Sequence, residues 1–166
     1  MRDAAVIKAR LRLLDQYVDE LRGARGVSFG EYVADTRLRR FVERTLQLAL
    51  EACLDIGNMV ISREGLRTPT DNQDVFRVLA HEGIVPPTLL ATLLKMARFR
   101  NLLVHDYARI DDAIVFGVMK KRLGDWTRFA RAIVRYLEAG HPRPRPRRAR
   151  RARADGSGVG GGNLRS

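Results

Sequence analysis

A long apolar stripe between residues 38 and 60 constrains the fold of this chain more than any other feature. Within it, apolar or small side chains recur at steps of three and four residues, the spacing that places them on one face of an α-helix. The stripe consists of Leu38, Phe41, Thr45, Leu48, Ala52, Ile56 and Val60. The sequence therefore predicts a long helix that buries one face, ended by Gly65 and the segment 68–70.

The segments on either side of this helix show the same helical spacing. The stripe nearer the N-terminus consists of Ile7, Leu11, Leu14, Val18 and Leu21. Ser28, which follows glycines, is a candidate cap for a short helical turn. Thr70 is a candidate cap for a third helix that closes at Gly83, with Asp71 and Asp74 complementing the positive end of its dipole.

Two further helices complete the predicted fold. One begins at Pro86–Pro87, since proline favours the first position of a helix. The last is predicted to run without interruption from Asp111–Asp112 to Leu137. No run of alternating apolar residues favours a strand. The predicted fold class is therefore all-α, an up-down helical bundle of four long helices plus one or two short ones.

Composition indicates one helical domain followed by a basic tail. With 166 residues and 45% hydrophobic residues, the chain is long enough for a single domain, predicted over residues 1–139. Residues 140–166 are rich in arginine, proline and glycine and are predicted to be disordered. They hold eight arginines and one aspartate, a charge of +7 that leaves +5 of the total +12 for the domain. This balance favours a polyanionic partner such as nucleic acid, although a tail without function is an equally open interpretation.

Several classes of protein are disfavoured by the sequence. The apolar runs are too short to cross a bilayer, and charges interrupt the N-terminal segment where a signal peptide would need an apolar core. Cys53 is the single cysteine, so neither an intramolecular disulfide nor a cysteine-cluster metal site can form. His81-Glu82 lacks the second histidine of a zinc-protease helix. We therefore expect a cytoplasmic protein without a membrane partner.

One short motif carries residues suited to phosphate chemistry. Arg100, His105 and Tyr107 form the pattern R-x4-H-x-Y within an otherwise apolar segment. An arginine is a permanent cation whose planar donors match a phosphate, and a histidine exchanges protons near neutral pH. Together they supply charge stabilisation and proton transfer, which cleavage of an RNA phosphodiester without a metal ion requires.

The wider motif resembles the HEPN ribonuclease domain, and within it the HepT-like toxins of type VII toxin–antitoxin pairs. The matching string is RNLLVHDYARID over residues 100–111, and the helical segment 46–57 is also similar. The resemblance covers roughly residues 5–138. It implies a HEPN-like helical fold and a metal-independent endoribonuclease that needs no cofactor. It also implies a homodimer in which two copies of the motif face each other across a composite site.

The spacing of Arg100 and His105 leaves two arrangements open. Five residues apart on a continuous helix, they lie on different faces, so either a helix end falls between them or a second chain completes the cleft. We expect Arg100 to hold the phosphate and His105 to act as general acid or base. In supporting roles, Asn101 orients the site, Asp106 tunes His105, and an acidic residue of the second helix pairs with Arg100. For that pairing the stronger candidate is Asp55, with Glu51 one turn earlier.

Without the resemblance, these residues also fit a simpler interpretation, in which His105 ends a helix and Arg100 is a solvated surface cation. Tyr107 also has two interpretations. It is either a tyrosine that packs by its ring, or, as the resemblance implies, an acceptor of AMP groups. In the second case a partner nucleotidyltransferase transfers the AMP and so inactivates the toxin. Arg98, Arg39 and Arg40 are candidates to bind the RNA backbone.

The leading prediction is thus a ribonuclease toxin neutralised by an MntA-like nucleotidyltransferase antitoxin, through AMP transfer, steric cover or both. Transfer RNA and messenger RNA are both compatible with it. The alternatives are a non-catalytic module that binds nucleotides, RNA or a nucleotidyltransferase, and a structural helical adaptor, which leaves the motif unexplained.

Overall fold

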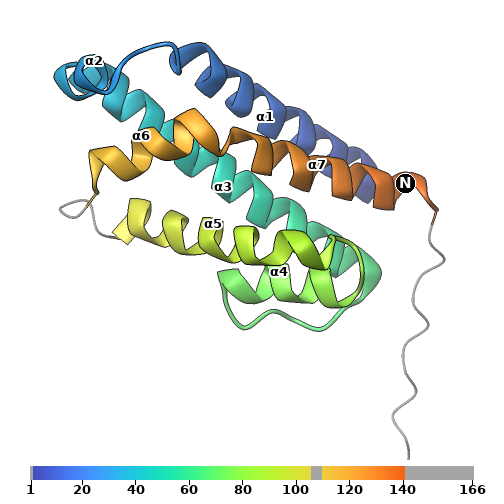
Figure 1. The fold of residues 1–166 in the computed structure, drawn as a ribbon. Coiled ribbons are helices and arrows are strands. Elements are labelled where there is room, and N and C mark those ends of the chain that lie inside the picture. Colours follow the sequence, from blue (N-terminus) through green and yellow to red (C-terminus); the bar gives the residue numbers. More distant parts are fainter. Residues whose placement is uncertain (1, 106–109, 141–166) are drawn as a thin grey trace, which may run out of the picture.

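The computed structural model describes residues 2–105 and 110–140, and within them it forms seven helices and no strand (Figure 1). The helices are α1 (Arg2–Ala24), α2 (Phe29–Ala34), α3 (Thr36–Glu64), α4 (Asn72–His81), α5 (Pro87–His105), α6 (Asp112–Lys121) and α7 (Leu123–Glu138). The all-α prediction is confirmed, and α1, α3, α5 and α7 are the four long helices. Three short helices accompany them, where one or two were expected. The predicted disordered tail lies outside the described residues.

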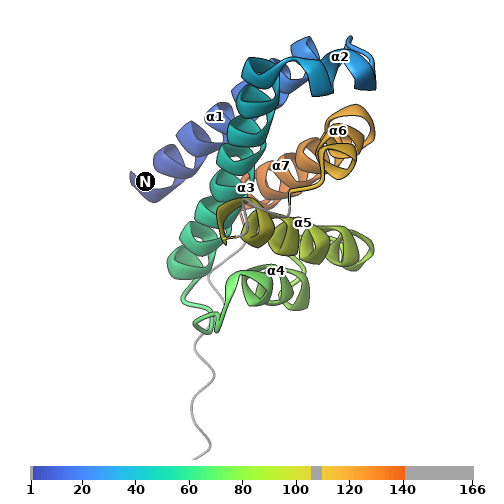
Figure 2. The ribbon, with the colours of Figure 1, turned by 90° about the vertical axis from the view of Figure 1, so that its left-hand side faces the viewer.

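Helix α3 is the central element of the bundle (Figures 1 and 2). It packs against each of the other six described helices. Besides much of the predicted stripe it buries a second row of side chains: Val42, Leu46, Ala49 and Cys53. A helix covered on several sides buries more than one face, which is why a single stripe described it incompletely. The expectation failed at Phe41, which is 43% exposed near the start of the helix.

A turn held by Asp74 connects α3 to α4. Gly65 ends α3 in the left-handed region, at φ 64°, where glycine is favoured. The guanidinium of Arg67 then donates two hydrogen bonds to the Asp74 carboxylate, at 2.6 and 2.8 Å, and the Thr70 amide donates a third at 2.9 Å. The N-cap of α4 is Asp71, whose side chain accepts from the Asp74 amide, so the predicted cap Thr70 was wrong by one residue.

The prediction of one continuous helix from Asp112 to Leu137 was wrong, because the helix is interrupted at Arg122. There the backbone leaves the helical region, with φ −116° and ψ 1°. The break lets α6 lie against α2, where Phe116 contacts Phe29 and Tyr32, while α7 packs on α1. One straight helix would not follow both of these neighbours.

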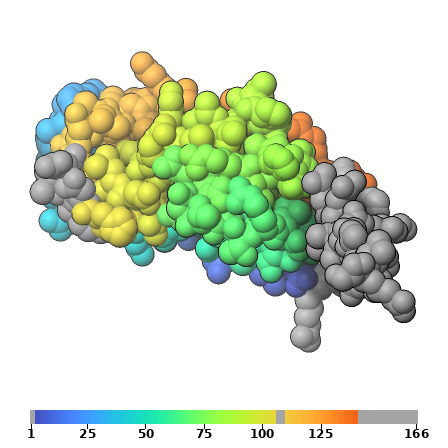
Figure 3. Space-filling model, turned by 90° about the horizontal axis from the view of Figure 1, so that it is seen from below, coloured from blue at the N-terminus to red at the C-terminus, as the bar shows by residue number. Residues whose placement is uncertain are grey.

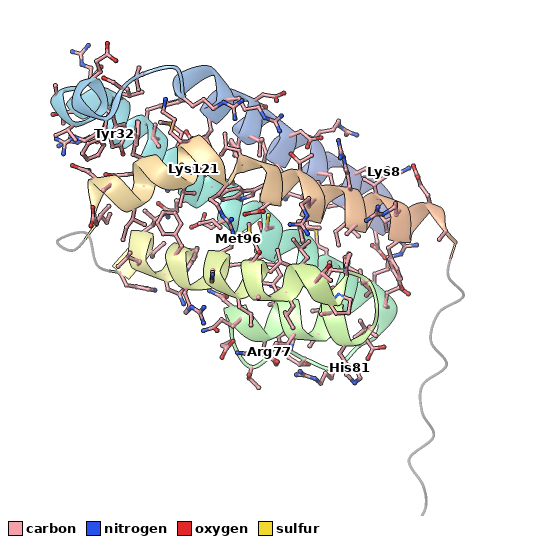
Figure 4. The ribbon with its side chains drawn as sticks, in the orientation of Figure 1. Lys8, Tyr32, Arg77, His81, Met96 and Lys121 are labelled. Atoms are coloured by element: carbon pink, nitrogen blue, oxygen red, sulfur yellow. The ribbon has the colours of Figure 1, made fainter. Side chains whose placement is uncertain are left out.

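Helix α5, which carries the motif, lies on one side of the bundle. It packs mainly on α3 and α4, and α4 and α5 together form the face shown in Figure 3. On its inner side, Met96 lies between α5 and α7 (Figure 4) and lines a largely apolar cavity of about 240 Å³. No helix among the described residues is long and apolar enough to cross a membrane.

Candidate active site

Arg100 is held against the central helix by an acidic side chain. Its guanidinium lies 3.6 Å from a carboxylate oxygen of Glu51 on α3, and its side chain is 22% exposed. The same oxygen of Glu51 accepts a hydrogen bond from the Gln47 amide at 2.9 Å. Asp55, the stronger candidate from the sequence, is exposed on α3, so the structure gives the pairing to Glu51.

Asn101 is directed toward a different neighbour. The side-chain amide of Asn72, in the first turn of α4, donates a hydrogen bond of 3.3 Å to the Asn101 side-chain oxygen. Consecutive residues of α5 thus contact the helices on either side of it: Arg100 contacts α3 and Asn101 contacts α4. These two contacts fix the rotation of α5 about its axis where the motif begins.

His105 is the last residue of α5 and is exposed. Since the helix is unbroken from Arg100 to His105, no helix end falls between them, which removes one of the two predicted arrangements. At 3.6 residues per turn they are about 140° apart around the axis and roughly 7.5 Å apart along it. Arg100 faces the bundle while His105 faces outward, so the described chain by itself does not bring the two groups onto one surface.

A polar groove lies beside Arg100, between α3 and the end of α5. It is lined by Arg40, Glu43, Arg44, Gln47 and Leu103 and has a volume of about 280 Å³. Arg40 and Arg44 are exposed, whereas Leu103 is buried. Burial raises the pKa of Glu43 above its ordinary value, and the negative charge of the Asp112 carboxylate raises it further. The Arg39 and Arg40 cations lower it in part.

The other predicted RNA-binding arginines differ in their surroundings. Arg98 is exposed on α5. Arg39 is only partly exposed and pairs with Asp112 at 3.1 Å, which ties α3 to the start of α6. Its guanidinium is therefore engaged in holding the bundle together, whereas Arg98 and Arg40 have no ion pair with another described residue.

Two predicted site residues, Asp106 and Tyr107, lie outside the described residues. Within 2–105 and 110–140, no group of three or more histidine, cysteine or carboxylate side chains is placed to hold a metal ion. Cys53 is buried, and burial raises the pKa of its thiol well above the ordinary value.

Sequence reasoning missed Gln47, Glu43 and Asn72 as parts of this region. The four-residue step from Gln47 to Glu51 is a local signal that could have suggested their hydrogen bond. The contact of Asn72 with Asn101 joins residues far apart in the chain and leaves no local signal. Taken together, the region offers a fixed guanidinium, an exposed imidazole and a groove with two further cations, a set suited to binding and protonating a phosphodiester.

The chain is similar to known ribonucleases. Residues 11–133 match the family described as Ribonuclease HepT-like. A tRNA nuclease HepT from Aphanizomenon flos-aquae is 29% identical over 135 residues, which cover 81% of this chain and 92% of the relative. An mRNA nuclease HepT from Shewanella oneidensis is 33% identical over 103 residues, covering 62% of this chain and 77% of the relative.

Solved structures show the same fold. The cytosolic protein YutE of Bacillus subtilis superposes with a TM-score of 0.73 at 22% identity, covering 82% of this chain and 92% of its own. The tri-AMPylated HEPN toxin of Shewanella oneidensis, in complex with its MNT antitoxin, superposes with a TM-score of 0.72 at 28% identity. That match covers 78% of this chain and 97% of the toxin.

Proposed function

Because the chain belongs to the family of HepT-like ribonucleases, we propose that it is an endoribonuclease toxin whose site is built from Arg100 and His105 and needs no metal ion. The relatives described as a tRNA nuclease and an mRNA nuclease support RNA as the substrate, and they leave both classes of RNA open. One structural observation carries the assignment of residues. Arg100 and His105 both lie on α5: the guanidinium of Arg100 is held by Glu51 of α3, and His105, the last residue of α5, is exposed.

In the proposed reaction the ribose 2′-oxygen attacks the adjacent phosphorus, and the bond from phosphorus to the 5′-oxygen breaks. His105 takes the proton of the 2′-hydroxyl as general base or gives a proton to the leaving 5′-oxygen as general acid. Arg100 binds the phosphate and stabilises the charge that develops on its oxygens. Asn101, held by Asn72, keeps Arg100 oriented, and Asp106 adjusts the proton affinity of His105.

The opposed directions of Arg100 and His105 favour a site completed by a second copy of the chain. In a two-fold homodimer each motif meets the other, so the exposed His105 of one chain can approach the phosphate bound by Arg100 of its partner. A concentration series in analytical ultracentrifugation that shows only monomer would contradict this arrangement.

We further propose that a nucleotidyltransferase antitoxin of the MntA type neutralises the toxin by transferring AMP to Tyr107. The AMPylated relative in complex with its antitoxin supports this regulation. Phosphates attached two residues from His105 add negative charge that would compete with RNA for Arg100. Co-expression with the cognate transferase should increase the mass of the chain by whole AMP groups. An unchanged mass, or the same increase in Tyr107→Phe, would contradict the assignment.

Cleavage of total transfer RNA and of a messenger RNA in EDTA tests the activity. We expect the unmodified chain to cut, His105→Ala and Arg100→Ala to be inactive, and His81→Ala to cut normally. His81 is a matched control because it is also an exposed histidine at the end of a helix, on α4 (Figure 4). Equal cleavage by the parent and His105→Ala would place the activity elsewhere. If the parent fails to cut while free of AMP, the chain is a binding module instead.

A further inference from the structure

The groove between α3 and α5 contains a carboxylate, Glu43, that no described residue pairs with. Glu43 lines this groove, is partly buried, and makes no hydrogen bond or ion pair with any other described residue. Glu51 and Asp35 have such partners, since Glu51 pairs with Arg100 and Asp35 caps the first turn of α3, whereas Asp55 is exposed to solvent and needs none. Burying part of a carboxylate without a donor is costly, so its two oxygens are available to a ligand with N–H groups.

The remaining lining residues indicate what kind of ligand fits. The exposed Arg40 and Arg44 lie four residues apart, on adjacent turns of α3 beside Glu43. Leu103 supplies a buried apolar wall from α5. A volume of about 280 Å³ is just below the usual range of small-molecule sites, about 300–1,000 Å³, so the groove suits one nucleoside better than a duplex. Cations for a phosphate, an apolar wall for a base and an acceptor for its edge are the elements of a nucleotide site.

The groove is connected to the proposed active site by hydrogen bonding and by sequence. Gln47 lines the groove and donates to Glu51, which lies 3.6 Å from Arg100. Leu103 follows Arg100 by three residues on α5, so both side chains are on the side of that helix that meets α3. A nucleotide in the groove would therefore lie next to the phosphate that Arg100 binds.

Among the four bases, guanine has the edge that matches Glu43. A carboxylate only accepts hydrogen bonds, and it accepts two in parallel from a pair of adjacent N–H donors. The Watson–Crick edge of guanine offers such a pair, N1–H and the N2 amino group, whereas the other bases place an acceptor beside each donor. Resting on the proposed ribonuclease function, we infer that this groove is a guanosine-selective subsite, in which Glu43 reads the base while Arg40 and Arg44 bind its phosphate.

The inference is tested by cleaving RNA of randomised sequence and sequencing the new ends. The parent should cut with guanosine enriched at one fixed position near the cleaved bond. Glu43→Ala and Glu43→Gln should still cut but lose this enrichment, while Glu20→Ala, which removes an exposed acid of α1, should keep it. Arg40→Ala and Arg44→Ala should raise KM and weaken its salt dependence without changing the preferred base. Arg131→Ala, an exposed arginine of α7, should leave both unchanged.

A substrate that lacks the N2 amino group tests the proposed contact between guanine and Glu43. Inosine differs from guanosine by the absence of the N2 amino group, so replacing the selected guanosine should lower kcat/KM of the parent by roughly tenfold. The same replacement should have little effect on Glu43→Ala. If the parent cuts without guanosine enrichment, or Glu43→Ala keeps it, the subsite is disproved and the ribonuclease function stands. If the parent cuts no RNA, both fail together.

Discussion

Among single residues, the ion pair between Arg100 and Glu51 orients the arginine side chain more than it stabilises the fold. The pair is partly exposed and its nitrogen and oxygen are 3.6 Å apart, and such pairs contribute at most about 1 kcal/mol to folding. Its effect is to restrict a long, many-rotamer side chain to one direction. Because Gln47 donates to the same carboxylate oxygen, Glu51 is itself restricted. An arginine fixed in this way loses less conformational entropy when it binds a phosphate.

This account predicts that Glu51→Ala lowers kcat for RNA cleavage by about 10- to 100-fold while leaving the fold intact, because Arg100 is no longer oriented. Glu51→Gln, which keeps the length of the side chain and one acceptor oxygen, should recover part of the loss. Asp55→Ala removes an acid one turn later on the same helix and should have little effect. Steady-state kinetics together with circular dichroism provide the measurement. An equal loss in Asp55→Ala would contradict the assignment of Glu51.

The candidate site could be predicted from the sequence only where its signal is local. Arg100 and His105 belong to one short motif, so the roles proposed for them follow from residue types and spacing. The choice between Glu51 and Asp55 could not be made from the sequence, because both lie on the same side of α3. The position of α5 along α3 decides which of the two meets Arg100. Asn72 and Leu103 join the site through packing between helices, and neither has a sequence signal.

At the scale of elements, the close approach of α3 and α4 depends on Gly57. A Cβ atom at this position would lie 2.6 Å from Cγ1 of Val75 and 3.2 Å from Cδ1 of Leu79. Both neighbours are buried, so neither can move away freely. The absence of a side chain at Gly57 therefore sets the distance between α3 and α4, and through Asn72 it also affects the position of Asn101.

We predict that Gly57→Ala destabilises the protein by about 1–3 kcal/mol, because overpacking outweighs the gain in helix propensity. Val75→Ala in the same chain should relieve the clash. Gly117→Ala is the matched control: this glycine is also inside a helix, α6, but a Cβ there meets nothing within 4 Å. It should stabilise the protein by about 0.5–1 kcal/mol. Urea unfolding measures all three, and a stabilising Gly57→Ala would contradict the close approach.

The turn before α4 gives a prediction on pH. Hydrogen bonds from Arg67, then from the Thr70 amide, hold the pKa of Asp74 well below its ordinary value of 3.8. A carboxyl whose pKa is lower in the folded state stabilises the fold fully above its unfolded pKa, and this contribution is lost as the pH falls through the folded pKa. The stability difference between the parent and Asp74→Asn should therefore be largest near neutral pH and shrink below about pH 4. Urea unfolding at several pH values measures this difference, and a difference that grows on acidification would contradict a stabilising role of the Asp74 carboxylate in the turn.

Most helices were predictable because each buries a stripe with a period that can be counted, as the wholly buried Ile7, Leu14 and Leu21 of α1 illustrate. The break at Arg122 was not predicted, although the sequence holds a signal for it: Arg122 is charged and lies midway between Val118 and Trp126, where the stripe would need an apolar side chain. The break arises because α6 and α7 pack on different helices, α2 and α1. The cap Asp71 was missed because Thr70 and Asp71 are both good capping residues and the contacts of Asp74 decide between them.

In the whole molecule, Arg100 and His105 are proposed to act on one phosphate although they face different directions on α5. Within one chain, the guanidinium of Arg100 faces the bundle and the imidazole of His105 faces outward. In the proposed homodimer, two chains related by a two-fold axis would offer both groups to a common site, because each would contribute the residue that the other directs away. The proposed activity would then require two chains.

Mixing two inactive variants tests whether the site is shared between two chains. Arg100→Ala and His105→Ala are each expected to be inactive, but a mixed dimer retains an intact Arg100 on one chain and an intact His105 on the other. After the two variants are unfolded together and refolded, RNA cleavage should return, at a level that depends on the fraction of mixed dimers. A mixture as inactive as either variant alone, with mixed dimers verified by mass spectrometry, would contradict a site shared between two chains.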